Sequence, residues 1–273
     1  MNVKILVCSH KNVEIPRNDC FMPIQVGSEL TDEDFGFVQD NTGYNISKKN
    51  RNYCELTAHY WAWKNLKNVD IIGLNHYRRF FDFGKRLSWL SPEFSFVDSN
   101  SFYEDYDLPD TELQLKKYDI ILPSKSHHPI LNTKQYCLYH LSNDWEILRD
   151  VINEVSPEYS EAFVLTMDKR NCMSDFNMFI TSWKIFNKYS EWLFRILFET
   201  EKRIHISQYV DQARVFGFMS ERLMNVFCEK EKLRIHYVPT IMPIDKLMPW
   251  MNTSRFSFNV RKIRYYIAFR LGY

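Results

Sequence analysis

Short apolar runs with the length of β-strands alternate along this sequence with longer segments that have helical periodicity. The strand-like runs cover residues 3–8, 69–77, 118–125, 177–183 and 235–240. Apolar side chains recur every three or four positions in residues 52–66, 133–155, 184–203 and roughly 210–230. Strands that alternate with helices predict an α/β fold with a mixed, mostly parallel sheet flanked by helices. Such sheets bind ligands beyond the carboxyl ends of their strands, so the residues there are the first candidates for a site.

Composition narrows the class of protein. A hydrophobic fraction of 45% and a charged fraction of 25% over 273 residues are typical of a globular chain with a sizeable core. A net charge of +1 leaves no excess of basic residues for a broad nucleic-acid-binding face. The six cysteines show neither a CxxC pair nor metal-ligand spacing, and no apolar run approaches the about 18 residues of a membrane span. We therefore expect a reduced, cytoplasmic protein without a cleavable signal peptide.

The apolar run 69–74 leads into a cluster of basic and polar residues, His76, Tyr77, Arg78 and Arg79. On an extended strand, His76 and Arg78 point to one side and Tyr77 and Arg79 to the other. Guanidinium groups bind phosphate through paired hydrogen bonds, so the cluster suits a phosphate, and Tyr77 could stack on an attached base or sugar. Ion pairs between the arginines and nearby acids would give the same pattern, so a purely structural role is the alternative.

Polar residues nearer the amino end are further candidates for the same site. Ser9, His10 and Lys11 follow the first predicted strand, and loops at strand ends often carry functional residues. Asn45 and Lys49 lie in a turn-rich segment from which their side chains could reach a nucleotide. The alternatives are an exposed loop for the first group and turn or helix-capping hydrogen bonds for Asn45.

One long segment and several shorter ones carry a family resemblance. NISKKNRNYCELTAHYWAWKNLKNVDIIGLNHYRRFF, residues 45–81, resembles the signature of a family of bacterial polysaccharide-locus glycosyltransferases. That family was long catalogued as a domain of unknown function and includes galactofuranosyltransferases. Residues 135–145, 176–183, 191–199 and 214–227 are similar to its later blocks. The resemblance covers about residues 3–240.

The resemblance implies a GT-A-like fold for residues 1–250 and transfer of a sugar, galactofuranose or galactose, from a UDP-sugar. The implied acceptor is a lipid-linked oligosaccharide in capsule, exopolysaccharide or O-antigen synthesis. Folds of this type usually end the corresponding strand in Asp-x-Asp, which binds a divalent metal, whereas this sequence has His76-Tyr77-Arg78. We therefore expect His76, Arg78 and Arg79 to stabilise the diphosphate leaving group with no metal or other cofactor required, and Mn²⁺ or Mg²⁺ stays an open alternative.

Inverting sugar transfer needs a base for the proton of the acceptor hydroxyl. The carboxylates considered are Asp175, Asp144 and Asp211, of which we favour Asp175 because it stands at the entry of a predicted strand. Asp144 lies four residues after His140 within the predicted helix 133–155, so their side chains would share one face. Such pairs are often simple surface contacts, which is the alternative.

Four more charged residues are assigned supporting roles. Glu55 precedes the basic strand end and could orient its arginines, while Arg214, Glu221 and Arg222 fall in a predicted helix and could buttress the site. A solvated Glu55 and ordinary intrahelical ion pairs are the alternatives.

Residues 251–273 have a different composition from the rest of the chain. Five basic residues and no acid alternate there with aromatic and aliphatic side chains, namely Arg255, Arg261, Lys262, Arg264 and Arg270. Such a segment suits the surface of an anionic membrane, so we expect peripheral attachment at the inner face of the plasma membrane. A helix packed on the domain with its cations in water is the alternative.

Two other functions fit the same residues. A non-catalytic carbohydrate-binding or assembly protein would use the abundant aromatic side chains to stack on sugars, and it would release no nucleotide from any donor. A phosphodiester-cleaving enzyme would use His76 and the arginines, and it would hydrolyse its substrate without an acceptor.

Overall fold

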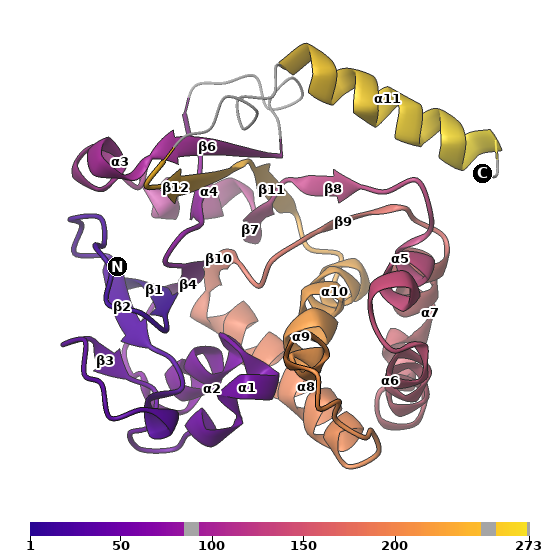
Figure 1. Ribbon diagram of the computed structural model, residues 1–273, viewed down its shortest axis with the longest axis horizontal. Helices are drawn as coiled ribbons and strands as arrows, with labels where there is room; N and C mark the ends of the chain where they lie inside the picture. Colours follow the sequence, from indigo (N-terminus) through magenta and orange to yellow (C-terminus); the bar gives the residue numbers. More distant parts are fainter. Residues whose placement is uncertain (85–92, 247–254, 272–273) are drawn as a thin grey trace.

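The computed structural model describes residues 1–84, 93–246 and 255–271, and its centre is a seven-stranded sheet (Figure 1). The strand order is β11-β7-β10-β4-β1-β2-β3. The bounds are β1 Val3–Ser9, β2 Phe21–Gln25, β3 Val38–Gln39, β4 Ile71–His76, β7 Ile120–Pro123, β10 Phe179–Ser182 and β11 Ile235–Val238. Neighbouring strands are parallel except that β10 runs antiparallel to β4 and β7. The predicted α/β class with a mixed, mostly parallel sheet is confirmed.

Helices cover one face of this sheet (Figure 1). They are α1 Asn50–Tyr53, α2 Leu56–Asn65, α5 Asn132–Tyr139, α6 Ser142–Val155, α7 Ser160–Phe163, α8 Trp183–Glu201, α9 Val210–Ala213 and α10 Val215–Lys230. Alternation along β1 sends Leu6 into the core under these helices, together with large side chains such as Trp145 and Phe216. Each such fully buried side chain contributes roughly 1.5–3 kcal/mol by leaving water.

The opposite face packs against a second, smaller layer. A three-stranded sheet in the order β5-β12-β6 lies there with two short helices. Their bounds are β5 Phe80–Phe81, β6 Phe94–Asp98, β12 Thr240–Ile244, α3 Ser99–Asp105 and α4 Thr111–Lys117. Ile5 and Val7 of β1 point into this layer and meet Phe80 and Phe102. Prolines and many acids between the second and third predicted strands favour an irregular excursion over residues 82–117, but the described part of this segment contains β6, α3 and α4.

Two elements lie outside these layers. Strands β8, Lys125–His127, and β9, Cys172–Ser174, form an antiparallel ribbon. Helix α11, Arg255–Leu271, lies close to β8 at the edge of the molecule, drawn in yellow in Figure 1. None of the described helices has the length and apolar composition needed to cross a membrane.

The predicted helix 133–155 is in fact two helices. Helix α5 ends at Tyr139, and the backbone of His140 and Leu141 is extended before α6 begins at Ser142. The prediction that His140 and Asp144 share one face of a single helix was therefore wrong, because the extended residues change the direction of the chain between them.

Candidate functional site

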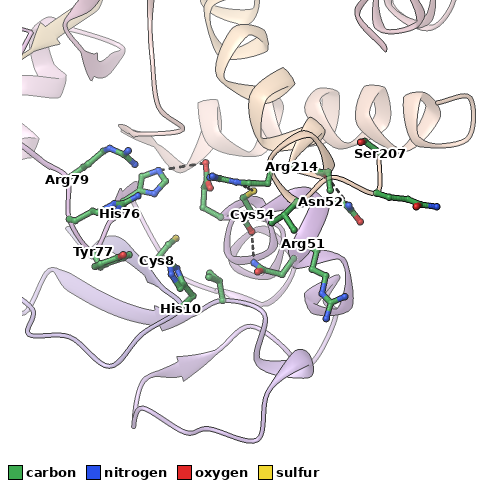
Figure 2. A pocket seen from close by; sticks show the side chains of 17 residues that line it. Cys8, His10, Arg51, Asn52, Cys54, His76, Tyr77, Arg79, Ser207 and Arg214 are labelled. Carbon is green, nitrogen blue, oxygen red and sulfur yellow. Dashed lines mark hydrogen bonds and ion pairs between the residues drawn. The ribbon is translucent and has the colours of Figure 1, made fainter. Parts of the chain in front are cut away.

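A cavity of about 630 Å³ opens where β1 and β4 end, between the sheet and the segments around α1 and α9. Figure 2 shows the strand-end residues His10, His76 and Tyr77 on one side and Cys54 and Arg214 on the other. Its lining is Cys8, His10, Val26, Asn50, Arg51, Asn52, Cys54, Glu55, His76, Tyr77, Arg78, Arg79, Ser207, Gln208, Val210, Ala213 and Arg214. This is the position at which open α/β sheets bind ligands.

The charge of this lining is strongly positive. Among the described residues of this lining, four are arginines, Arg51, Arg78, Arg79 and Arg214, and one, Glu55, carries a carboxylate. Arginine stays protonated in proteins, so the cavity carries an excess of positive charge at any physiological pH. Its volume is large enough for a ligand of nucleotide size. The size and charge of the cavity therefore suit an extended anion.

His76 differs from the arginines because its imidazole is neutral at neutral pH. The pKa of His76 is lowered to about 4, mainly by burial and in addition by the nearby arginines, although Glu55 acts in the opposite direction. The Nε2 atom of His76 lies 3.7 Å from Oε1 of Glu55 and has no hydrogen-bond partner in the described part of the chain. His76 therefore offers a hydrogen-bonding group rather than a charge.

Arg79 joins the cavity to the chain that precedes β10. Its guanidinium carbon lies 4.4 Å from the centre of the Phe176 ring, in cation–π geometry. Its Nε atom is buried with no hydrogen-bond partner among the described residues. Phe176 has a φ of 64°, a left-handed conformation that costs a bulky residue of order 1–3 kcal/mol. Surrounding contacts must hold this strained segment in place.

A second strained residue, Cys54, shapes the opposite wall. Its φ of 51° separates α1 from α2, where the sequence predicted one continuous helix over 52–66. Asn50 supports the break, since its Nδ2 donates to the Cys54 carbonyl at 2.8 Å. Nε of Arg214 donates to Cys54 Sγ at 3.3 Å, which ties α1 to the start of α10. Burial raises the pKa of the Cys54 thiol to about 12, so it is protonated at neutral pH.

Glu55 anchors a hydrogen-bond network that continues away from the cavity. Asn177 donates from Nδ2 to Glu55 Oε1 and, at 3.1 Å, to the Gly217 carbonyl. Ser220 Oγ donates to Asn177 Oδ1 at 2.7 Å. Asn177 is therefore fixed between the basic strand end and α10, and its neighbours Asp175 and Phe176 are fixed with it.

Asp175 follows β9, and the segment that carries it adjoins the cavity through Phe176 and Asn177. The carboxylate accepts a hydrogen bond from Ser126 of β8. Burial raises the pKa of Asp175, while Ser126, Arg222 and His128 partly offset that rise. The segment carrying Asp175 packs under Arg79 through Phe176, so a carboxylate lies close to the anion cavity without lining it.

Glu221 of α10 interacts electrostatically both with residues of the cavity lining and with Asp175. The pKa of Glu221 is raised to about 7, mainly by burial; Asp175 and Glu55 add to the rise, and Arg222 and Arg79 oppose it. Nη1 of Arg222 lies 3.0 Å from Glu221 Oε2. Glu221 thus interacts electrostatically with Glu55 and Arg79 of the cavity lining and with Asp175, and the supporting role of Glu221 and Arg222 stays a prediction.

Several predicted site residues lie elsewhere. Ser9 is buried, and its Oγ donates to the Lys11 carbonyl at 2.6 Å. Neither Ser9 nor Lys11 lines the cavity. Asn45 makes turn hydrogen bonds to the Asn41 and Gly43 carbonyls, as its alternative role predicted. Lys49 pairs with Glu201 at 2.6 Å.

The other two candidate bases also lie away from the cavity lining. Asp144 is buried in the first turn of α6, where burial raises its pKa. His140 stacks on Phe218 with a centroid distance of 4.1 Å. Asp211 is exposed on α9, whose residues Val210 and Ala213 do line the cavity.

The structure also adds residues that the sequence did not single out. Arg51 and Asn52 of α1 and Ser207 and Gln208 before α9 line the cavity. Asn52 Nδ2 donates to the Ala213 carbonyl at 2.9 Å and thereby joins these two segments. Arg51 lies inside the family-like segment 45–81, which was the available signal, whereas residues 207–208 belong to no pattern in the sequence.

Comparison with known proteins identifies the family of this chain. Residues 4–232 match the model of a protein family described as "Domain of unknown function (DUF4422)". The chain belongs to this family. No curated protein matches the chain.

A solved structure resembles this DUF4422 member in both sequence and fold. The apo structure of the WbbM bifunctional glycosyltransferase aligns with a TM-score of 0.81 and 30% sequence identity over 89% of this chain. The alignment covers 45% of the WbbM chain, so this chain spans less than half of that protein. Among the described residues of the DUF4422 chain, no three His, Cys, Asp or Glu side chains are grouped so that they could hold a metal ion.

Proposed function

We propose that the protein is a glycosyltransferase that moves a sugar from a nucleotide-sugar donor, a UDP-sugar, to a hydroxyl of a glycan acceptor. The observation that supports this most is the cavity at the ends of β1 and β4, whose lining holds four arginines and one carboxylate. A sugar nucleotide carries two linked phosphates, and guanidinium groups bind phosphate oxygens through paired hydrogen bonds. The likeness to WbbM, a glycosyltransferase by its name, supports the same reaction class.

The proposed reaction assigns a task to each part of the site. Arg78, Arg79 and Arg214 neutralise the charge that develops on the diphosphate as its bond to the sugar breaks. Neutral His76 donates or accepts a hydrogen bond in the same region, oriented by Glu55. Asp175 takes the proton of the attacking acceptor hydroxyl. Galactofuranose or galactose is the proposed sugar, and a lipid-linked oligosaccharide of a bacterial surface polysaccharide is the proposed acceptor.

We expect nucleoside diphosphates to stabilise the folded protein without added metal. A ligand that binds only the folded state raises its stability in proportion to the logarithm of its concentration over Kd. The measurement is a thermal-shift series with UDP, GDP, CMP and inorganic phosphate, each with and without EDTA. A shift with UDP that survives EDTA supports a diphosphate site formed by arginines.

Other results, in this series or in an assay of donor hydrolysis, would support a different function. A shift that EDTA abolishes and Mn²⁺ restores would contradict metal-independent binding. A well-folded protein that no nucleotide stabilises would contradict the donor site and favour carbohydrate binding without catalysis. Hydrolysis of a donor at the same rate with and without an acceptor would instead support a phosphodiester-cleaving enzyme.

We also propose that α11 contacts an anionic membrane surface, where a lipid-linked acceptor would be held. Ile263, Tyr266, Ile267 and Leu271 are each about half exposed or more, and their spacing places them along one stripe of the helix. The residues of α11 include basic side chains and no acid. An apolar stripe beside basic residues is the pattern of helices that lie in the membrane interface.

Binding to vesicles tests this surface directly. The full chain is expected to co-sediment with phosphatidylglycerol vesicles and not with phosphatidylcholine vesicles. Arg264→Glu with Arg270→Glu should reduce the bound fraction about tenfold or more, because each basic residue near such a surface contributes about 1 kcal/mol. The matched control is Lys67→Glu with Lys184→Glu, two exposed lysines on other elements. Equal loss in both double variants would reject α11 as the contact.

A further inference from the structure

The ribbon of β8 and β9 presents a second group of polar residues beside Asp175. In β8 the register pairs Lys125 with Ser174, Ser126 with Met173 and His127 with Cys172. Because side chains alternate along a strand, Ser126 lies on the face of the ribbon opposite to Lys125 and His127. That face also carries Asp175, since Ser126 donates a hydrogen bond to its carboxylate.

The next residue on this face is His128, and its backbone extends the ribbon beyond β8. The His128 amide donates to the Asn171 carbonyl at 2.8 Å, and Asn171 Nδ2 donates to the His128 carbonyl at 2.7 Å. These two bonds hold the backbone of His128 in place. Its Nε2 atom is buried and has no hydrogen-bond partner in the part of the chain that the structure describes. A buried ring nitrogen in this state is available for a ligand or a neighbouring carboxylate.

The backbone that carries Asp175 is held as firmly as that of His128. Asn225 of α10 accepts from the Ser174 amide at 2.9 Å and donates to the Ser174 carbonyl at 2.9 Å. On the other side, Asn177 is fixed by Glu55 and Ser220. Asp175 thus has a fixed backbone, a hydroxyl donor and an adjacent imidazole, which is the arrangement expected of a preorganised base.

We propose that Ser126 and His128 are positioning residues for Asp175, and that the three side chains together activate the acceptor hydroxyl. This inference rests on the proposed sugar transfer. The acceptor O–H bond breaks with its proton passing to Asp175, and the oxygen bonds to the anomeric carbon of the donor. The bond from that carbon to the diphosphate breaks, and its electron pair leaves on the diphosphate in the arginine cavity.

The electrostatic surroundings fit this assignment. Burial lowers the pKa of His128, Asp175 and Glu93 raise it, and Arg222 and His127 lower it. His127 lies with Nδ1 3.4 Å from Glu93 Oε1, on the other face of β8. Each of His128 and Asp175 therefore favours the charged form of the other, and each should titrate differently when the other is replaced.

The first measurement needs no activity. NMR titration of the histidine ring protons in the full chain, with His128 assigned from the His128→Gln variant, gives its pKa in the wild type and in Asp175→Asn. We expect the pKa of His128 to fall by about one unit in Asp175→Asn, because the carboxylate that favours imidazolium is gone. His236, whose pKa is lowered by burial alone, is the internal control. An unchanged His128 titration would overturn the pairing.

The second measurement separates positioning from folding. Transfer rates are measured against pH for wild type, His128→Leu and His128→Gln, with UDP binding followed by thermal shift. His128→Leu should lower kcat about tenfold and move the acid limb of the profile up by about one pH unit, since Asp175 loses a group that favours its ionised form. His128→Gln keeps an N–H donor, so its kcat and the position of its acid limb should both lie close to those of the wild type.

The results distinguish this inference from the proposed function. Equal losses in the leucine and glutamine variants, or an unmoved acid limb, would overturn the role of His128 while sugar transfer by the wild type stands. A wild type that binds UDP and transfers no sugar to any tested acceptor would instead contradict the proposed function, and the NMR titration would still decide whether Asp175 and His128 are paired.

Discussion

Replacing Asp175 with asparagine is expected to lower sugar transfer by roughly a thousandfold while UDP binding stays intact, because a general base contributes about 10²–10⁴ in rate. The amide keeps the size of the side chain and its contact with Ser126 but cannot take a proton. Turnover and thermal shift with UDP are measured on the same preparation. The control is Asp150→Asn, an exposed carboxylate on α6, which should transfer at the wild-type rate.

The same assignment sets the direction of the pH dependence. Burial raises the pKa of Asp175, so the ionised, active form is lost as the pH falls through a value above that of an ordinary aspartate. Transfer should therefore decline on the acid side earlier than an unperturbed carboxylate would predict. If Asp175→Asn retained full activity, another group would have to be the base, and Glu221, whose pKa is raised to about 7, would be the next to replace.

The second large effect is expected from the arginines of the cavity. Arg78→Ala and Arg214→Ala should each weaken UDP binding about 10- to 100-fold, because a hydrogen bond to a charged group contributes roughly 1.5–3 kcal/mol. Uridine, which has no phosphate, should lose far less affinity than UDP in both variants. Titration calorimetry at two salt concentrations measures this, with Lys67→Ala as the control. Equal losses for uridine and UDP would show that the arginines shape the pocket rather than bind phosphate.

The alternation of strands and helices was sufficient to predict the class of fold, and the reason is physical. The 3.6-residue and two-residue periods are set by which faces are buried, so β1, β4, β7, β10 and β11 were all found. Periodicity carries no information on strand direction, which is why the antiparallel β10 was not predicted. It also misses helix breaks such as Cys54, whose backbone accepts a local hydrogen bond from Asn50 and whose side chain accepts one from Arg214, which is distant in sequence.

The candidate site was only partly accessible from the sequence. Residues 76–79 were found because a buried, apolar strand does not usually end in a cluster of basic residues. Arg51 and Ser207 were missed, since they lie on short segments that have no periodic signal and join the cavity only through tertiary contacts. Ser126 and His128 likewise become candidate site residues only once the β8–β9 register is known, because it places them on the same face of the ribbon as Asp175.

Apart from Val26, the cavity walls come from four stretches that are far apart along the chain, around residues 8–10, 50–55, 76–79 and 207–214. During synthesis from the amino end, the first three emerge long before the last, and the hydrogen bond from Arg214 to Cys54 can form only after Arg214 has emerged. If the cavity binds a nucleotide as proposed, the nascent chain has the complete site only after residues 207–214 have packed against the other three stretches. On that proposal, nucleotide binding would also measure whether the last of the four stretches has joined the domain.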